Sequence, residues 1–167
     1  MKHLTILTIA TLMLPFVSLG NERAISLVKS FEGFKSSPYH CEAGKVTIGY
    51  GFTSQEMIAK GYITEKEANK EVFRMCQEIA KNLKVELGNS NTLKPNEEAA
   101  VVSFIYNVGW ANFKASTMCR LLKEGKRGAL VGAEFHKWVY VSKGNAKVVS
   151  KGLKNRRHKE AMCFMCG

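Results

Sequence analysis

The 167-residue chain has no low-complexity tract, no internal repeat and no linker rich in proline, glycine or serine; it has only three prolines in all. Because such segments usually separate folding units, their absence argues against a chain of several domains. Residues 21 to 167 are enough to bury one hydrophobic core. We therefore expect a single globular domain at 21–167, preceded by a separate segment at 1–20.

Acidic side chains are scarce. The chain has 14 acidic residues against 25 lysines and arginines, which gives a formal net charge of +11. Lys2 is the only charged residue before position 21, so the part from 21 onward keeps +10. A surface this basic favours an anionic partner, such as peptidoglycan, teichoic acid or an anionic membrane. Basic residues interleaved with aromatics, typical of nucleic-acid motifs, are missing between Lys143 and Lys159, so we expect no nucleic-acid partner.

No apolar run is long enough for a permanent transmembrane helix. The run Leu4 to Leu19 would span roughly 24 Å as a helix, whereas the hydrocarbon core of a bilayer is ~30 Å thick. A basic tip at Lys2 and small residues at Ser18 and Gly20 are typical of a secretory signal. Residues 1–20 are therefore expected to be a signal peptide cleaved after Gly20, or a signal anchor that touches the membrane transiently and is then released.

Five cysteines, an odd number, all follow the export segment: Cys41, Cys76, Cys119, Cys163 and Cys166. In an oxidising compartment an odd cysteine is often a reactive thiol. We expect Cys41 to be free and the other four to be paired or close together, in one of three connectivities. The Cys163–Cys166 pair is interpreted as structural. Cys76 and Cys119 lack the local spacing of zinc ligands, so we expect no metal and no cofactor.

The candidate chemistry lies in one stretch of twenty residues, Glu32 to Gly51. Apolar residues at helical spacing between Glu22 and Phe31 predict a helix that ends at Glu32-Gly33, because glycine commonly follows a helix C-terminus. Partial burial and the negative end of the helix dipole would disfavour the ionised form of Glu32. Such a carboxyl can act as a general acid.

Strict alternation of residue type from Lys45 to Gly51 predicts a half-buried strand. Val46 and Ile48 would face the core, which turns Thr47 toward any cleft, where its hydroxyl can hold a water molecule. We expect Cys41 on the partner strand, across from Thr47.

The thiolate of Cys41 can serve as a nucleophile or as a base. His40 is adjacent in sequence, but neighbouring strand residues point to opposite faces, so a Cys–His dyad is not expected.

Several further helices are predicted. A capping box at Thr64–Glu67 begins a long helix with an apolar stripe, and Pro95 begins a second one. The segment Glu97 to Tyr106 is apolar nearly all round and should be central, ending at 107–109. Shorter helical patterns cover Ala115–Lys123, Gly128–His136 and Lys151–Met165.

The spacing Glu32, eight residues, Cys41, five residues, Thr47 resembles the catalytic signature of the phage-type lysozymes (glycoside hydrolase family 24), with cysteine at the position held by Asp or Cys in that family. The segment 103–109 is similar to the central helix and turn of these enzymes. The residues Gly152-Leu153, Asn155-Arg156-Arg157 and Glu160 are similar to their C-terminal helix. The resemblance covers about residues 22 to 165.

This resemblance implies an α+β fold with a small lobe containing a β-hairpin, a long connecting helix and a larger all-helical lobe. The cleft between the lobes would bind glycan strands of peptidoglycan. The implied activity is that of a muramidase, which cuts the β-1,4 bond between N-acetylmuramic acid and N-acetylglucosamine and lyses bacterial cells. We expect a monomer, exported across the bacterial inner membrane to the periplasm or the outside.

The resemblance also implies roles for individual residues. Glu32 would be the general acid, Cys41 the nucleophile or base, and Thr47 the residue that positions water or substrate. Arg156 would contact Glu32. Tyr39 and Asn107 would support the site or bind substrate.

Two other functions fit the sequence. One is a cysteine amidase or peptidase of the cell wall that pairs Cys41 with His136 or His158. The other is a cationic membrane-binding protein without enzymatic activity.

Overall fold

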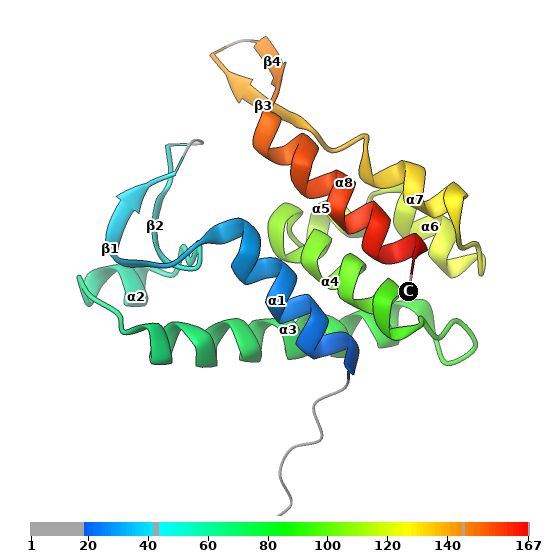
Figure 1. Cartoon of the computed structure of the whole chain (residues 1–167), viewed down its shortest axis with the longest axis horizontal. Coiled ribbons are helices and arrows are strands. Elements are labelled where there is room, and N and C mark those ends of the chain that lie inside the picture. Colours follow the sequence, from blue (N-terminus) through cyan, green and yellow to red (C-terminus); the bar gives the residue numbers. More distant parts are fainter. Residues whose placement is uncertain (1–18, 42–43, 145, 167) are drawn as a thin grey trace, which may run out of the picture.

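Eight α-helices and two two-stranded antiparallel sheets make up the part of the chain that the computed structural model describes, residues 19–41, 44–144 and 146–166 (Figure 1). The helices are α1 (Leu19–Glu32), α2 (Gln55–Ala59), α3 (Glu65–Leu87), α4 (Pro95–Val108), α5 (Trp110–Lys114), α6 (Thr117–Lys123), α7 (Ala129–Phe135) and α8 (Lys151–Met165). The strands are β1 (Lys35–His40), β2 (Val46–Gly49), β3 (Tyr140–Lys143) and β4 (Ala146–Val149).

The small lobe contains the hairpin of β1 and β2, with the short helix α2 after it (Figure 1). The predicted pairing of Cys41 with Thr47 is wrong, because Tyr39 is the residue opposite Thr47. β1 ends at His40, and Cys41 lies in the closing turn, where its backbone N–H donates to the carbonyl of Lys45.

The prediction that Val46 faces the core is also wrong. Val46 is 37% exposed, whereas Ile48 and Tyr50 are buried. β2 enters the core only after its first residue. Gly49 then turns the chain at φ +67°, and a Cβ there would lie 2.5 Å from the Phe52 ring, so the tight return to Phe52 requires glycine.

Helix α3 connects the two lobes along one side of the molecule (Figure 1). It begins with the predicted capping box, in which the Thr64 hydroxyl accepts from the backbone N–H of Glu67 and the Glu67 side chain accepts from the backbone N–H of Thr64. One face of the helix is buried over its whole length, through Ala68, Val72, Cys76, Ala80, Leu83 and Leu87. This amphipathic face packs on α1 and α4 and confirms the predicted stripe, apart from Ile79, which is only partly buried.

Helix α4 is the centre of the larger lobe. Every residue from Asn96 to Ile105 is buried, and α1, α3 and α8 pack around it. It ends at Val108, and Gly109 follows at φ +85°, as predicted from the 107–109 turn. A helix that is apolar nearly all round must be covered on every side, which explains its position.

The α+β architecture with two lobes and a long connecting helix is confirmed, but the larger lobe is not all-helical. It carries the hairpin of β3 and β4, in which Tyr140 pairs with Val149 and Ser142 pairs with Lys147. Valine-rich runs on both sides of Gly144 favour strands over a helix. The helices α2 and α5 were not predicted either, because five residues are too few to show helical periodicity.

Helix α1 begins at Leu19, within the segment that the sequence assigns to export. Gly20 is buried, and a Cβ there would lie 3.0 Å from the carbonyl oxygen of Pro95 in α4. The rest of the export segment, 1–18, lies outside the described residues. Among the described helices, none combines the length and apolarity needed to cross a bilayer.

All five cysteines are free thiols in the structure. Cys41 is therefore free, as predicted. The other four, predicted to be paired or close together, form no disulfide with one another. They come from three different helices or their ends: Cys76 lies in α3, Cys119 in α6, and Cys163 and Cys166 at the end of α8. Cys76 and Cys119 are buried and behave as small apolar residues of the core.

Candidate active site

A cleft of about 1730 Å³ lies between the small lobe and the larger lobe. On one side its lining comes from the end of α1 and from the β1–β2 hairpin, and on the other from α4, α8 and the β3–β4 hairpin. All six candidate residues predicted from the sequence line this one cleft or its base: Glu32, Tyr39, Cys41, Thr47, Asn107 and Arg156. The fold therefore brings together residues that are up to 124 positions apart.

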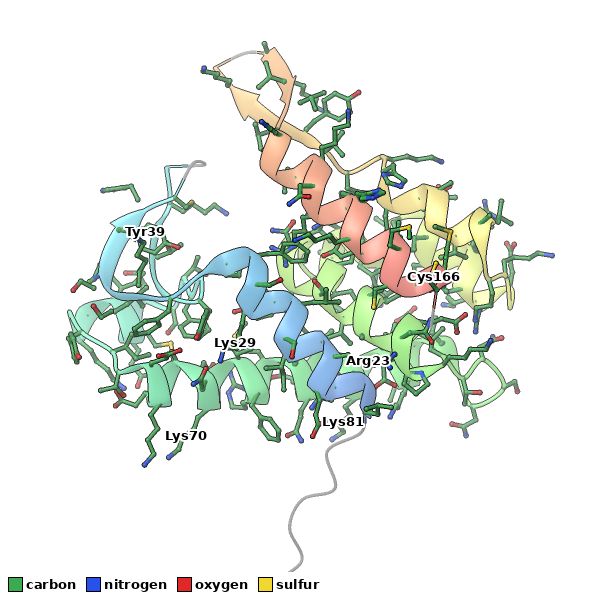
Figure 2. All side chains as sticks on the ribbon, in the orientation of Figure 1. Arg23, Lys29, Tyr39, Lys70, Lys81 and Cys166 are labelled. Carbon is green, nitrogen blue, oxygen red and sulfur yellow. The ribbon has the colours of Figure 1, made fainter. Side chains whose placement is uncertain are left out.

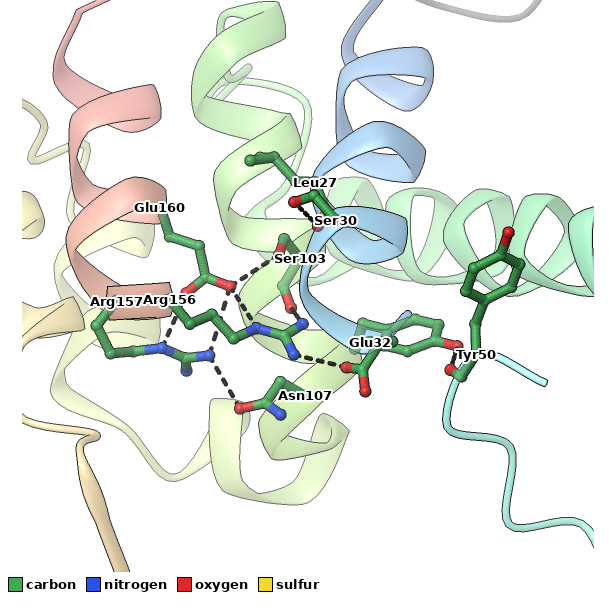
Figure 3. Close-up of polar contacts among 10 residues, drawn as sticks. Leu27, Ser30, Glu32, Tyr50, Ser103, Asn107, Arg156, Arg157 and Glu160 are labelled. Atoms are coloured by element: carbon green, nitrogen blue, oxygen red, sulfur yellow. Dashed lines mark hydrogen bonds and ion pairs between the residues drawn. The ribbon is translucent and has the colours of Figure 1, made fainter. Parts of the chain in front are cut away.

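Glu32 is the last residue of α1, and its side chain keeps 20% of its surface exposed. Arg156 Nη1 lies 2.6 Å from Glu32 Oε1, so the predicted contact is present (Figure 3). The guanidinium is itself almost buried and stacks over the ring of Phe31 at 4.9 Å. Glu32 is therefore held at the wall of the cleft with part of its carboxyl open to solvent.

A buried network continues behind Arg156 (Figure 3). Arg156 Nε donates to Glu160 Oε1 at 3.1 Å, and its Nη2 donates to the carbonyl of Ser103 at 3.2 Å. The Ser103 hydroxyl also donates to Glu160, at 2.7 Å. Because its hydrogen bonds come from α4 and from within α8, the guanidinium has little freedom to turn away from Glu32.

Arg157 completes the network. Its Nε lies 2.9 Å from Glu160 Oε2, and its Nη2 donates to Asn107 Oδ1 at 2.9 Å. Burial raises the pKa of the Glu160 carboxyl and lowers the pKa of Arg157 to about 10, while the attraction between the two acts against both shifts. Two guanidinium groups lie within 3.1 Å of the Glu160 carboxyl, one at each of its oxygens.

Thr47 and Tyr39 are joined across the hairpin. The Thr47 hydroxyl lies 3.4 Å from the carbonyl oxygen of Tyr39, to which it donates, and the Thr47 side chain is buried at the base of the cleft. Cys41 lines the same cleft and is partly exposed, so its thiol is accessible. The chain contains no aspartate, so the described lining of the cleft includes no Asp carboxylate beside Glu32.

Two residues of the site were not predicted. A Cβ on Gly51 would lie 2.9 Å from Glu32 Oε2, so the backbone at φ +81° passes directly beside the carboxyl. Tyr106 donates from its hydroxyl to the carbonyl of Tyr50 at 2.8 Å, which ties α4 to this backbone. Burial is the main cause of a raised pKa at Tyr106, with the Glu32 charge adding to it. The sequence signal for the contact at Gly51 was a glycine within the alternating strand pattern, because a glycine there lets another group approach the backbone closely.

The candidate histidine partners of Cys41 lie elsewhere. His136 and His158 pack against each other, with ring centroids 6.1 Å apart, and neither lines the cleft.

Cys166 lies at the end of α8, on the other side of the molecule from Tyr39 in β1 (Figure 2). Within the described residues, no group of three His, Cys or Glu side chains forms a set that could ligate a metal.

The arrangement therefore combines a carboxyl held by an arginine, an accessible thiol and a strand hydroxyl within one open cleft. A carboxyl in this setting can donate a proton to a leaving oxygen, and a thiolate or an activated water can attack the carbon on the other side of the bond.

The family model described as "Phage lysozyme" matches residues 29–160 of the chain. The endolysin of Bacillus phage PZA is 35% identical over 153 residues, which covers 88% of this chain and 55% of that protein. The SAR-endolysin of Bacteriophage PS119 is 30% identical over 134 residues, which covers 77% of this chain and 73% of that protein. The chain thus spans about half the length of the Bacillus phage endolysin.

Among solved structures, the endolysin from Escherichia coli O157:H7 phage FAHEc1 superimposes with a TM-score of 0.75 at 26% identity, covering 90% of this chain and 95% of that one. The similarity therefore includes both lobes and the cleft between them.

Proposed function

The chain belongs to the phage lysozyme family, and from this membership we propose that it is a muramidase: a glycosidase that degrades peptidoglycan and causes bacterial lysis. Its substrate is the glycan strand, cut at the β-1,4 bond between N-acetylmuramic acid and N-acetylglucosamine. The enzyme acts as a monomer and needs no metal or cofactor.

One observation carries the proposal. The Glu32 carboxyl, Cys41 and Thr47 line one cleft between the lobes, and Arg156 holds Glu32 at 2.6 Å. General acid catalysis needs a carboxyl in a fixed position that the substrate can reach. The ion pair with Arg156 and the 20% exposure of the Glu32 side chain support this role. Tyr39 and Asn107 support the site through Thr47 and Arg157 respectively.

The proposed reaction proceeds as follows. Glu32 gives its proton to the glycosidic oxygen as the bond between that oxygen and the anomeric carbon breaks. The anomeric carbon accepts an electron pair either from the Cys41 thiolate or from a water positioned by Thr47, which loses its proton to Cys41. In the first course a water molecule later displaces the thiolate from the anomeric carbon and gives its proton to Glu32, so the anomeric configuration is retained. In the second course the configuration is inverted.

Glu32→Gln tests the proposal, because it keeps the shape of the side chain and removes its proton. We expect hydrolysis of purified cell walls to fall by about 10²–10⁴-fold with little change in unfolding temperature. Glu124→Gln is the matched control, since Glu124 is an exposed residue paired with Arg120. The products are assayed for both reducing sugar ends and free amines. Release of amines in place of reducing ends would identify an amidase, and near-normal activity in Glu32→Gln would contradict the assignment.

We also propose that the protein is exported across the inner membrane to the periplasm and that residues 1–20 act as a releasable anchor without cleavage after Gly20. Support comes from the structure of α1, in which Leu19 and Gly20 form the first turn and Gly20 packs on Pro95. Cleavage after Gly20 would remove that turn from the folded domain. The intact mass of the protein recovered from the periplasm tests this proposal: a mass lacking residues 1–20 would contradict it.

A further inference from the structure

The β3–β4 hairpin forms a wall of the cleft that the catalytic residues do not use. Tyr140, Ser142 and Lys147 all line the cleft, together with Lys137 and Trp138 just before the hairpin. In Figure 1 this hairpin projects from the larger lobe beside the start of α8, at the top of the view, and the β1–β2 hairpin of the small lobe lies to the left of it. Neither strand is paired with any other strand in the described residues.

The register of the hairpin separates its two faces. Ser142 pairs with Lys147 and Tyr140 with Val149, so these four side chains share one face, whereas Lys143 and Ala146 belong to the other. Three of the four residues on the first face line the cleft, against Val141 alone of the four on the other face (Val141, Lys143, Ala146 and Val148). The first face is therefore turned toward the substrate.

This face has no structural partner of its own. Tyr140 is 56% exposed and Val149 is 54% exposed, which is unusual for large apolar residues in a strand pair. Lys147 is exposed and has no carboxylate within ion-pair distance in the described part of the chain. No acidic residue occurs between Glu134 and Glu160 in the sequence, so the positive charge of the hairpin is unbalanced locally.

An isolated two-stranded hairpin is only marginally stable in water, and a partner that covers one face would stabilise it. The geometry points to a carboxylate-bearing partner: we propose that Lys147 binds the carboxylate carried by a muramic sugar, while Tyr140 packs on the adjoining sugar or peptide. This carboxylate belongs to the stem peptide where one is attached, and to the lactyl group where the strand is bare. This inference rests on the proposed function, because it takes the glycan in the cleft as the source of the carboxylates.

Carboxylates are favoured over the phosphates of a separate wall polymer by their position. Each muramic sugar brings its acidic group into the cleft along with the bond to be cut, whereas a phosphate polymer would have to enter as a second strand. Lys137 is less available for this role, because its ammonium group is paired with Glu134 at 2.6 Å.

The test compares Lys147→Gln with Lys143→Gln, which remove the same charge from opposite faces of one hairpin. The substrates are soluble peptidoglycan strands free of teichoic acid, and the same strands with their carboxylates amidated. Lys147→Gln should raise KM about two- to five-fold on the unmodified strands, the range expected for an exposed ion pair, with kcat unchanged. It should have no effect on the amidated strands, and Lys143→Gln should have no effect on either.

Tyr140→Ala should raise KM on both substrates, because packing does not depend on the charge of the strand. A binding measurement separates this inference from the proposed activity: the same substitutions are made in the Glu32→Gln background and cosedimentation with insoluble walls is measured. Equal effects of Lys147→Gln and Lys143→Gln would overturn the inference. So would an effect of Lys147→Gln that is still seen on amidated strands, or one that is seen only when teichoic acid is present. If no reducing ends are released but Lys147→Gln still weakens binding to the walls more than Lys143→Gln does, only the muramidase assignment is overturned.

Discussion

The carboxyl of Glu32 is positioned by groups from three separate parts of the chain. The end of α1 supplies the residue, Arg156 of α8 donates to it, and the backbone at Gly51 passes beside it. Each contact limits a different motion of the side chain. The position of the Glu32 carboxyl therefore depends on these neighbours as much as on α1.

Cys41 offers the sharpest test at this scale. If its thiol does the work of a second carboxylate, Cys41→Asp should retain activity, because a carboxylate at that place can also act as base or nucleophile. Cys41→Ala should lose it. The wild type and the Asp variant should also differ in the pH dependence of their activity, because thiols and carboxyls as classes ionise in different pH ranges.

The measurement is the pH dependence of kcat/KM on soluble glycan strands for the wild type and both variants. Treatment with a small alkylating reagent provides the control, since it should inactivate the wild type and leave Cys41→Asp active. Full activity in Cys41→Ala would contradict a role for the thiol.

Gly51 should not tolerate a side chain. A Cβ at this position would meet Glu32 Oε2 at 2.9 Å, and the positive φ of the residue adds a backbone cost of about 1–3 kcal/mol in Gly51→Ala. We expect kcat to fall as the carboxyl is displaced. Gly61→Ala is the matched control, because Gly61 has a similar φ of +68° and no atom within 4 Å of its Cβ position. If both variants lose stability but keep kcat, the contact with Glu32 has no catalytic importance.

At the scale of the elements, α1, α4 and α8 meet at one charged junction. Arg156 of α8 bridges the buried Glu160 and Glu32 at the cleft, and Arg157 also pairs with Glu160. Ser103 of α4 contacts both Arg156 and Glu160. Burial of so much charge is costly unless every group is paired. The junction thus links the packing of the helices to the orientation of Arg156.

Glu160→Gln should therefore be strongly destabilising. It removes the partner of two buried guanidinium groups, a change that costs about 3–5 kcal/mol in the free energy of unfolding. Glu78→Gln, which breaks an exposed ion pair with Arg74 in α3, should cost less than about 1 kcal/mol. Urea denaturation of both variants measures the difference. A similar small loss in both would show that the buried junction contributes no more than a surface pair.

At the scale of the whole molecule, the core buries groups that release protons only with difficulty. Burial raises the pKa of the Cys76 thiol to about 12, whereas a thiol in the unfolded chain ionises near pH 8.5. Between these values the folded state keeps a proton that the unfolded chain has lost. Raising the pH through this window therefore favours unfolding.

We expect the free energy of unfolding to fall as pH rises from about 8.5 to 12, with Cys76 contributing up to ~1.4 kcal/mol per pH unit. Cys76→Ala should reduce this slope, whereas Cys166→Ala should not, because Cys166 is exposed at the end of α8. Denaturation at a series of alkaline pH values provides the measurement. Identical slopes in both variants would contradict the assignment to the buried thiol.

Much of the architecture could be predicted from local patterns. The capping box at Thr64, the apolar stripe of α3 and the all-round apolarity of α4 each follow from side chains within one element, and each is present in the structure. Two predictions in the hairpin failed for a shared reason. The place where the turn closes was not deducible from the strand patterns. The turn puts Tyr39 opposite Thr47 and Cys41 outside the strand, and it leaves Val46, the first residue of β2, at the exposed end of the hairpin.

Residue order alone sets which chemical groups are available: one helix-ending glutamate, a thiol and a hydroxyl at fixed spacing, and a basic C-terminal region. Helix caps and periodicity act between neighbours in sequence, so they can be deduced without a fold. Which groups face the cleft is decided only when α1, α4 and α8 pack together, since Arg156 meets Glu32 across 124 positions. The same holds for the β3–β4 hairpin: the register of its strands and its place beside the cleft, not its sequence, put Lys147 in the lining of the cleft and leave Lys143 outside it.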